Sequence, residues 1–407
     1  MARAAGYRQL LRNRRFLLFE TSAIAASAGY SIYAISIPLL AYRFSGSLLV
    51  VGLVLFAEFG AYTLTFLIAP WVDRARDKRT IFLACFPAQA VAVGLIGVAL
   101  TTGLLTTGLL LGLVAFVSFL WDFAWAATNV APRLLLSKDE LYRAQGFGGL
   151  VGGVTQLGGY ATGGALLVLL GPAGGMFLYA AFLGVAATAA AFVSLPTDRL
   201  GGRTDYWREF RDGWRFFRRS TPGSLLPLGM VEVARGFFGA APALMITSIA
   251  VVVAAGSTST YAGLYASWVI GGVAVGVVVG ELNPRGRAGR VLAVAALVEA
   301  GGFLAAVVFA GAWLHAAYVW FLIGAASTAY LVSESTFIQG ATPSGSIGRV
   351  SSNLYVFTGV GSSIGAITLG AVVGQWSLLE FGALVAAGFL AIGLSVGLIP
   401  SIRSLAF

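Results

Sequence analysis

The sequence predicts an all-α membrane protein with twelve transmembrane helices, arranged as two six-helix pseudo-repeat halves. Of its 407 residues, 58% are hydrophobic and only 10% are charged. A soluble domain typically carries about 25% charged residues, and no soluble core could hide this much apolar surface. The lipid bilayer must therefore be the solvent for most of the chain. Evenly spaced apolar runs and a one-sided distribution of arginine indicate the same fold.

Apolar runs long enough to span a bilayer recur along the whole chain. A span needs roughly 20 apolar residues, and inside hydrocarbon the backbone of such a run must be helical to satisfy its own hydrogen bonds. Cutting the sequence at charged and turn-forming clusters gives twelve runs, near residues 16–41, 48–71, 80–101, 104–127, 144–170, 173–195, 224–253, 259–281, 290–310, 313–334, 349–374 and 379–399.

Basic residues predict the orientation of these runs. The formal net charge is +10, and almost all lysines and arginines fall in the two ends and in the even-to-odd loops, with Arg43 and Arg235 as the exceptions. Because cytoplasmic loops carry the excess of basic residues, both termini are predicted to be cytoplasmic. The cytoplasmic loops therefore account for the positive net charge, and nucleic-acid binding is not needed to explain it. The arginine and alanine richness suggests a GC-rich bacterial genome, and the predicted location is therefore the bacterial inner membrane, which the chain would cross several times.

The longest loop divides the chain into an N-terminal half at 1–195, a cytoplasmic linker at 196–223 and a C-terminal half at 224–407. Within the linker, aromatic residues recur at helical spacing with arginines between them, which predicts an amphipathic helix on the anionic inner leaflet. A binding site for a partner protein is the alternative. The basic loops 69–79 and 280–290 align with one another, which fits a transporter built from two parallel repeats.

Composition also narrows the chemistry. Cys85 is the only cysteine and His315 the only histidine, so neither an intramolecular disulfide nor a His/Cys metal cluster is expected. No nucleotide-binding loop and no nucleophile–base set is evident in the sequence, so we expect neither ATP drive nor enzymatic activity. We therefore predict no cofactor and no metal. The predicted partners are the lipid bilayer, a small-molecule substrate and protons, with no nucleic acid and a monomeric state.

Four stretches of the chain resemble the major facilitator superfamily, and within it the bacterial exporter branch of enterobactin and macrolide efflux proteins. They are Asp73-Arg74 with Lys78-Arg79, the linker segment 209–220, Gly348-Arg349-Val350, and residues 38–42 with 45–47. Ala69 replaces the signature glycine of the first stretch, and Tyr160 replaces a proline of the exporter signature.

This resemblance implies a secondary transporter that exports a small amphipathic organic molecule, such as a drug, natural product or siderophore. It also implies proton antiport and alternating access of the two halves around a midplane site. The alternatives are an importer or uniporter of a small metabolite on the same fold, and a membrane sensor or assembly protein that does not transport.

Charged residues inside the spans are functional candidates because burying a charge there is costly. Glu58 and Asp122 are predicted to couple transport to protons, since burial favours the neutral form of a carboxyl group and neither has a cation within a helical turn. Glu20 and Glu334 lie near the cytoplasmic interface and are expected to reach water. Glu299 lies in mid-span, and the sequence assigns it no role.

Two further groups of residues are candidates for a gate. Glu232 and Arg235 are three residues apart on one helical face, which predicts an ion pair. Asp73 is expected to accept hydrogen bonds from neighbouring helix starts, with Arg74 and Arg79 bridging to the other half.

The predicted substrate cavity is mainly apolar with a few polar groups, as is typical of sites for amphipathic ligands. Aromatic and amide side chains in mid-helix are its candidates, and ordinary helix packing is the alternative for each one. They are Tyr30, Tyr33, Trp125, Gln156, Phe237, Trp268 and Asn353.

Overall fold

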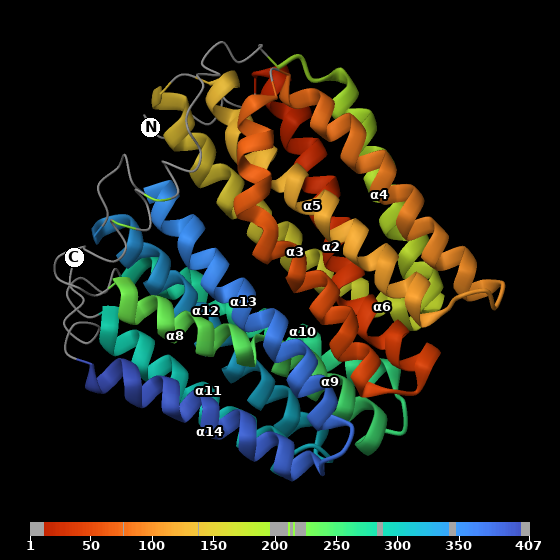
Figure 1. Ribbon diagram of the computed structural model, residues 1–407, viewed down its shortest axis with the longest axis vertical. Coiled ribbons are helices and arrows are strands. Elements are labelled where there is room, and N and C mark those ends of the chain that lie inside the picture. Colours follow the sequence, from red (N-terminus) through yellow and green to blue (C-terminus); the bar gives the residue numbers. More distant parts are fainter. Residues whose placement is uncertain are drawn as a thin grey trace. The chain divides into compact units, whose positions relative to one another are not determined.

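The computed structural model of this chain describes residues 12–75, 77–136, 138–195, 211, 215, 225–282, 288–341 and 347–399. Its regular structure within these ranges is helical, as predicted (Figure 1). Nine helices in the described part of the chain are long and apolar enough to cross a membrane, and Leu48–Ala61 is a shorter apolar helix. Each of the twelve predicted runs coincides with helical structure over most of its length.

The chain divides into two compact units. The first consists of Met1–Leu40 with Leu64–Arg203, and the second of Ala41–Thr63 with Thr204–Phe407. The segment Ala41–Thr63 thus belongs with the second unit, although the predicted halves assign it to the first. The predicted amphipathic helix of the linker lies outside the described residues, apart from the helical positions Arg211 and Arg215.

Five helices are described in the first part of the chain, between residues 12 and 195. They are α2 (Arg14–Ser45), α3 (Leu48–Arg74), α4 (Lys78–Thr101), α5 (Thr107–Leu135) and α6 (Lys138–Phe192). Within the first unit, α4 packs along both α5 and α6. Side chains cap two of these helices: Asp77 accepts a hydrogen bond from the backbone of α4, and Thr106 does the same for α5. Such caps satisfy backbone donors that a helix start leaves unpaired.

Helix α6 contains two predicted runs, 144–170 and 173–195, joined at a kink. Gly171 interrupts the helical geometry with φ 69° and ψ 179°, and Pro172 follows it. Glycine tolerates this positive φ because it has no Cβ, and proline, which lacks a backbone N–H, is well placed at the start of the next helical segment. The Gly-Pro pair therefore sets the break at the place where the apolar runs predict it.

The second unit contains the helical elements from α8 to α14. They are α8 (Leu225–Phe237), η1 (Phe238–Ala240), α9 (Ala241–Ser248), η2 (Ile249–Val253), α10 (Thr258–Leu282), α11 (Ala288–Val308), α12 (Trp313–Ala341), α13 (Ile347–Val373) and α14 (Leu378–Leu398). Helix α12 packs along α10 and α11, α11 along α14, and α13 along α8. The first four elements cover the single predicted run 224–253, and a 3₁₀ turn and a π turn interrupt its regular α geometry.

Glycines allow the closest helix contacts in the second unit. A Cβ added at Gly324 of α12 would collide with the backbone oxygen of Trp268 in α10, and one added at Gly365 of α13 would collide with the backbone oxygen of Phe237 in α8. Small residues at helix interfaces let backbones approach in this way inside membranes. These contacts bring α12 close to α10 and α13 close to α8.

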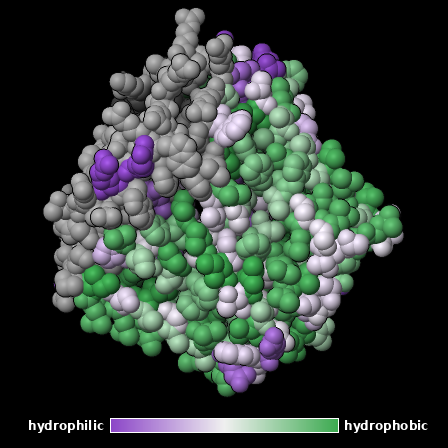
Figure 2. All heavy atoms as spheres, in the orientation of Figure 1, coloured by the Kyte–Doolittle hydropathy of each residue, from purple (hydrophilic) through white to green (hydrophobic). Residues whose placement is uncertain are grey.

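The outer surface of the described residues is mostly apolar, as expected for a lipid-facing protein. In the face that Figure 2 shows, hydrophobic residues cover most of the described surface and strongly hydrophilic ones gather in small groups. Large apolar side chains stand fully on the surface, including Leu169 and Leu314, each 78% exposed. Exposure of this kind is stable in lipid, where apolar side chains meet hydrocarbon rather than water.

Candidate functional site: a buried charged cluster in the second unit

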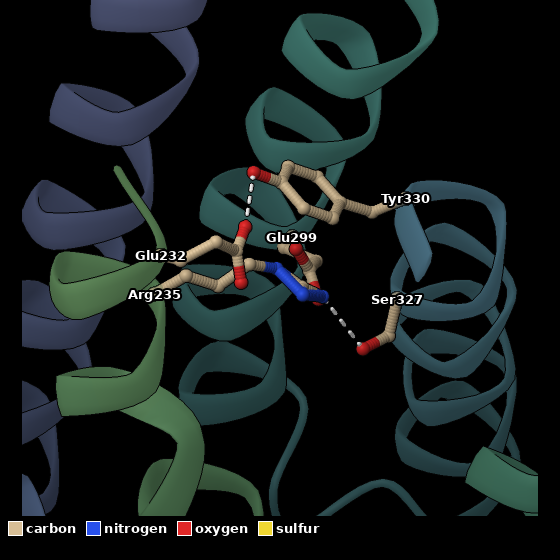
Figure 3. Close-up of polar contacts among 5 residues, drawn as sticks. All are labelled: Glu232, Arg235, Glu299, Ser327 and Tyr330. Carbon is tan, nitrogen blue, oxygen red and sulfur yellow. Dashed lines mark hydrogen bonds and ion pairs between the residues drawn. The ribbon is translucent and has the colours of Figure 1, made fainter. Parts of the chain in front are cut away.

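Side chains from α8, α11 and α12 meet inside the second unit (Figure 3). The guanidinium of Arg235, on α8, lies 3.4 Å from Glu299 on α11, measured from Nη2 to Oε1. The same nitrogen donates a hydrogen bond to the hydroxyl oxygen of Ser327, on α12, at 3.2 Å. Arg235 therefore links three helices of the second unit through one end of its side chain.

Tyr330 of α12 contacts both charged residues of α8. Its hydroxyl donates a hydrogen bond of 2.9 Å to Oε1 of Glu232, and its ring centroid lies 3.9 Å from the guanidinium carbon of Arg235. Thr358 of α13 donates to the other carboxylate oxygen of Glu232 at 3.5 Å. In Figure 3 the guanidinium extends from the side of the Glu232–Tyr330 pair toward Ser327, with Glu299 beside it.

The cluster is buried. Glu232 is 3% exposed, Glu299 is 2% exposed and Tyr330 is fully buried, while the Arg235 side chain is 15% exposed. Two of its polar atoms, Nε of Arg235 and Oε2 of Glu299, have no hydrogen-bond partner among the described residues. An ionised group in such a place is costly unless it is paired, so these atoms mark where a proton, water or ligand would be stabilised.

A third carboxylate belongs to the same electrostatic network. Glu334, one turn after Tyr330 on α12, interacts electrostatically with Glu232 and Arg235. It is 7% exposed, so the water access predicted from its place near the end of the run is slight. One guanidinium thus faces three carboxylates in this part of the structure. We call Glu232, Arg235, Glu299, Tyr330 and Glu334 the charged cluster.

The structure modifies the predicted ion pair of Glu232 and Arg235. The two residues interact electrostatically, but the direct ion pair that the described structure contains joins Arg235 to Glu299, which is 64 residues away in the sequence. Glu299, to which the sequence assigns no role, therefore has Arg235 as its partner. The sequence signal that marks Glu299 as a functional candidate is its charge in the middle of a span. Its pairing with Arg235 could not be predicted, because it depends on how α8 packs against its neighbours.

Asp122 lies in the first unit, on α5, and is 4% exposed. Its neighbour Trp121 stacks on Tyr30 of α2 with ring centroids 4.3 Å apart, and Tyr33 packs against Tyr179 of α6 at 5.2 Å. Two predicted cavity residues, Tyr30 and Tyr33, thus belong to an aromatic group that includes α5 and α6.

The other predicted coupling residue, Glu58, lies on the part of α3 that belongs to the second unit, and it is 7% exposed. Farther along this segment, Thr63 contacts α13, where its hydroxyl lies 3.4 Å from that of Ser363. Glu58 and Asp122 are therefore both buried, as predicted, but they belong to different compact units.

The remaining cavity candidates are spread over several helices. Trp125 is 48% exposed, and Phe237 packs edge-on against Phe238 at 5.1 Å between ring centroids. Trp268 packs against Tyr265. The indole nitrogen of Trp268 and the amide nitrogen of Asn353 are buried without a hydrogen-bond partner among the described residues. The side chain of Gln156 lies outside the described structure.

The predicted cytoplasmic gate is described only in part. The side chains of Asp73 and Arg74 lie outside the described structure. Arg79 donates a hydrogen bond to the backbone oxygen of Ala191, near the end of α6 in the same unit, and its predicted bridge to the other half remains a prediction. Lys78, which is fully buried, donates to the backbone oxygens of Val72 and Ala75 at 2.5 and 2.8 Å, so it ties the end of α3 to the start of α4.

Comparison with known proteins assigns the family. The sequence profile of the Major Facilitator Superfamily matches residues 21–366, which is most of the chain, and the chain belongs to that superfamily. It therefore has the fold of a membrane-embedded transporter. No curated protein matches the chain in sequence.

Solved structures share this fold at low sequence identity. The nucleoside transporter NupG is 11% identical with a TM-score of 0.72, covering 94% of this chain and 98% of its own. A bacterial homologue of the human lysosomal transporter Spinster is 18% identical with a TM-score of 0.67, covering 97% of both chains. A POT family transporter crystallised with a thioalcohol-conjugated peptide is 12% identical with a TM-score of 0.69, covering 93% of this chain and 94% of its own.

Proposed function

We propose that this chain is a secondary active transporter that exports a small amphipathic organic molecule by proton antiport. The two halves would alternate access to a midplane site between twelve spans. On this proposal the protein is a monomer in a bacterial inner membrane with both termini in the cytoplasm. The exporter-like motifs at 38–47, 73–79, 209–220 and 348–350 support the direction of transport.

The observation that carries the proposal is the excess of buried carboxylates over buried cations. In the charged cluster, Glu232, Glu299 and Glu334 are each at most 7% exposed, and all three interact with the single guanidinium of Arg235. Not all three carboxylates can remain ionised in a low-dielectric interior without further positive charge. Protons are the simplest source of that charge.

Reversible protonation is also what coupling requires. A coupling carboxylate must release its proton on one side of the membrane and regain it on the other, so its neutral form must be accessible at the working pH. Glu58 and Asp122 remain our candidates for this role, as the sequence predicts. The charged cluster adds candidates in the second unit.

Direction and energy source are tested together in membrane vesicles. Everted vesicles from cells expressing the protein are energised so that their interior becomes acidic, and uptake of rhodamine 6G, an amphipathic cationic dye, is followed by fluorescence. A proton-driven exporter fills everted vesicles, and a protonophore abolishes the filling. Accumulation in right-side-out vesicles alone would instead establish an importer. Equal dye levels in vesicles with and without the protein, across amphipathic dyes of each charge, would contradict export.

A further inference from the structure

We propose that Glu334 is the carboxylate at which the protein binds the positively charged group of a cationic organic substrate, in competition with a proton. This inference rests on the proposed function and deepens it by naming the substrate class. It concerns the second unit alone.

Glu334 differs from the other carboxylates of the charged cluster in its partners. Glu232 accepts hydrogen bonds from Tyr330 and Thr358, and Glu299 is ion-paired with Arg235. For the Glu334 side chain the described structure contains neither a hydrogen bond nor an ion pair, and its interactions with Glu232 and Arg235 are electrostatic only. The residue is nevertheless 7% exposed. A nearly buried carboxylate with all its acceptor positions open is suited to an external donor or cation.

The charges around Glu334 favour a cation over an anion. From α8 it faces Glu232 and Arg235, and from α13 it faces Tyr355, whose electrostatic environment includes Glu334. Glu299 of α11 engages Arg235 directly, and its attraction reduces what the guanidinium offers to Glu334. The site therefore carries a net deficit of positive charge, which an organic cation or a proton would fill and an anion would increase.

An aromatic side chain within electrostatic range of Glu334 suits an organic cation better than an inorganic one. Tyr355 is 57% exposed and lies on α13 within electrostatic range of Glu334. Aromatic faces attract organic cations through their ring quadrupole and also bury apolar surface of the ligand. A carboxylate with an exposed tyrosine in its electrostatic range thus offers both an ionic and an apolar contact to a ligand large enough to reach both, which matches an amphipathic cation.

The test measures binding to purified protein in detergent, without any gradient. Rhodamine 6G is the cationic probe, and fluorescein, an anionic dye with a similar ring system, is the matched comparison. We expect the wild-type protein to bind rhodamine 6G in fluorescence anisotropy, more weakly in acidic than in mildly alkaline buffer, and to bind fluorescein much more weakly. Glu334→Gln should weaken rhodamine binding by about tenfold or more, because a charged contact is lost, and should flatten the pH dependence.

The control is Glu380→Gln, which removes a carboxylate from the same unit at the start of α14. Glu380 forms a capping box with Ser377, and glutamine can replace glutamate in that box, so affinity and pH dependence should match wild type. If Glu334→Gln does not elute as a single folded species, Glu334→Asp replaces it and should keep the pH dependence with weaker affinity. Unchanged affinity and pH profile in Glu334→Gln, or equal binding of fluorescein, would overturn the inference.

The outcome is separable from that of the proposed function. Binding as described, without any proton-driven accumulation in vesicles, would refute proton antiport and leave the cation site standing. Proton-driven export of an uncharged substrate, together with wild-type dye binding by Glu334→Gln, would refute the cation site and leave the proposed function standing.

Discussion

Tyr330 holds the guanidinium of Arg235 over its ring, with 3.9 Å between the guanidinium carbon and the ring centroid. The hydroxyl of the same tyrosine donates to Glu232 at 2.9 Å. One side chain therefore orients two opposite charges that lie three residues apart on α8. Because Arg235 is directed over the ring, its terminal nitrogen reaches Glu299 and Ser327 on two other helices. The arrangement makes Tyr330 a positioning residue of the charged cluster.

Substitution of Tyr330 separates its two contacts. Tyr330→Phe keeps the ring under Arg235 and removes the hydrogen bond to Glu232, so it should lower the free energy of unfolding by about 1.5–3 kcal/mol, the range for a hydrogen bond to a charged group. Tyr330→Leu should cost more, because it also removes the cation–π contact. Unfolding in detergent measures both. Tyr318→Phe, at a residue that is 63% exposed, is the control, and equal stability of Tyr330→Phe and this control would refute the positioning role.

The Arg235–Glu299 pair should show strong energetic coupling. Arg235→Gln leaves the carboxylate of Glu299, which is 2% exposed, without its ion-pair partner, and breaking a buried pair in this way costs about 3–5 kcal/mol. The double variant Arg235→Gln/Glu299→Gln removes both charges and should recover much of that loss. A double-mutant cycle of unfolding free energies measures the coupling. Additive single-variant effects would mean that the pair contributes nothing as a pair.

Close helix packing in the second unit makes Gly324 sensitive to a single methyl group. Gly324→Ala would press its Cβ onto the backbone oxygen of Trp268, so α10 and α12 would have to separate. Overpacking of this kind typically costs about 1–3 kcal/mol. Gly301→Ala, on α11, meets nothing within 4 Å and should be neutral or stabilising, because alanine favours helix. Thermal unfolding of the two variants should therefore shift in different directions or by clearly different amounts.

The predicted topology can be tested with single cysteines, since Cys85 is the only native cysteine and is buried. In a Cys85→Ser background, His315→Cys should react with a membrane-impermeant maleimide added to intact cells, because His315 is predicted to lie outside and is exposed. Ser220→Cys, in the predicted cytoplasmic linker, should react only after permeabilisation. The reverse labelling pattern would invert the whole orientation.

Much of the fold follows from local sequence, because a membrane span must be long, apolar and helical. The break at Gly171-Pro172 is one example, since both residues act through their own backbone chemistry. The end of α12 is a counter-example. The apolar run predicts an end at residue 334, whereas the helix continues to Ala341. In a hydropathy pattern the charge of Glu334 marks the end of the apolar run. In the structure Glu334 interacts with the charged cluster, and the helix continues past it.

Of the candidate site, the sequence predicts one pair on α8 and otherwise only separate charges. Spacing on one helical face brings Glu232 and Arg235 together, and the structure keeps them on the same network. Spacing could not show that Glu299 pairs with Arg235, because their proximity depends on how α8 and α11 pack in the folded unit. For the same reason, hydropathy alone places Glu334 at the water interface rather than within this cluster.

The most direct test of proton coupling uses purified protein in liposomes with an imposed pH gradient. The account predicts that wild-type protein and Glu380→Gln concentrate rhodamine 6G only while the gradient is present. Glu58→Gln or Asp122→Asn should abolish this uphill accumulation and leave downhill exchange measurable, because a neutral amide cannot carry the proton. Accumulation by wild-type protein that ignores the gradient would contradict proton antiport, and gradient-driven accumulation by both amide variants would contradict the assignment of Glu58 and Asp122.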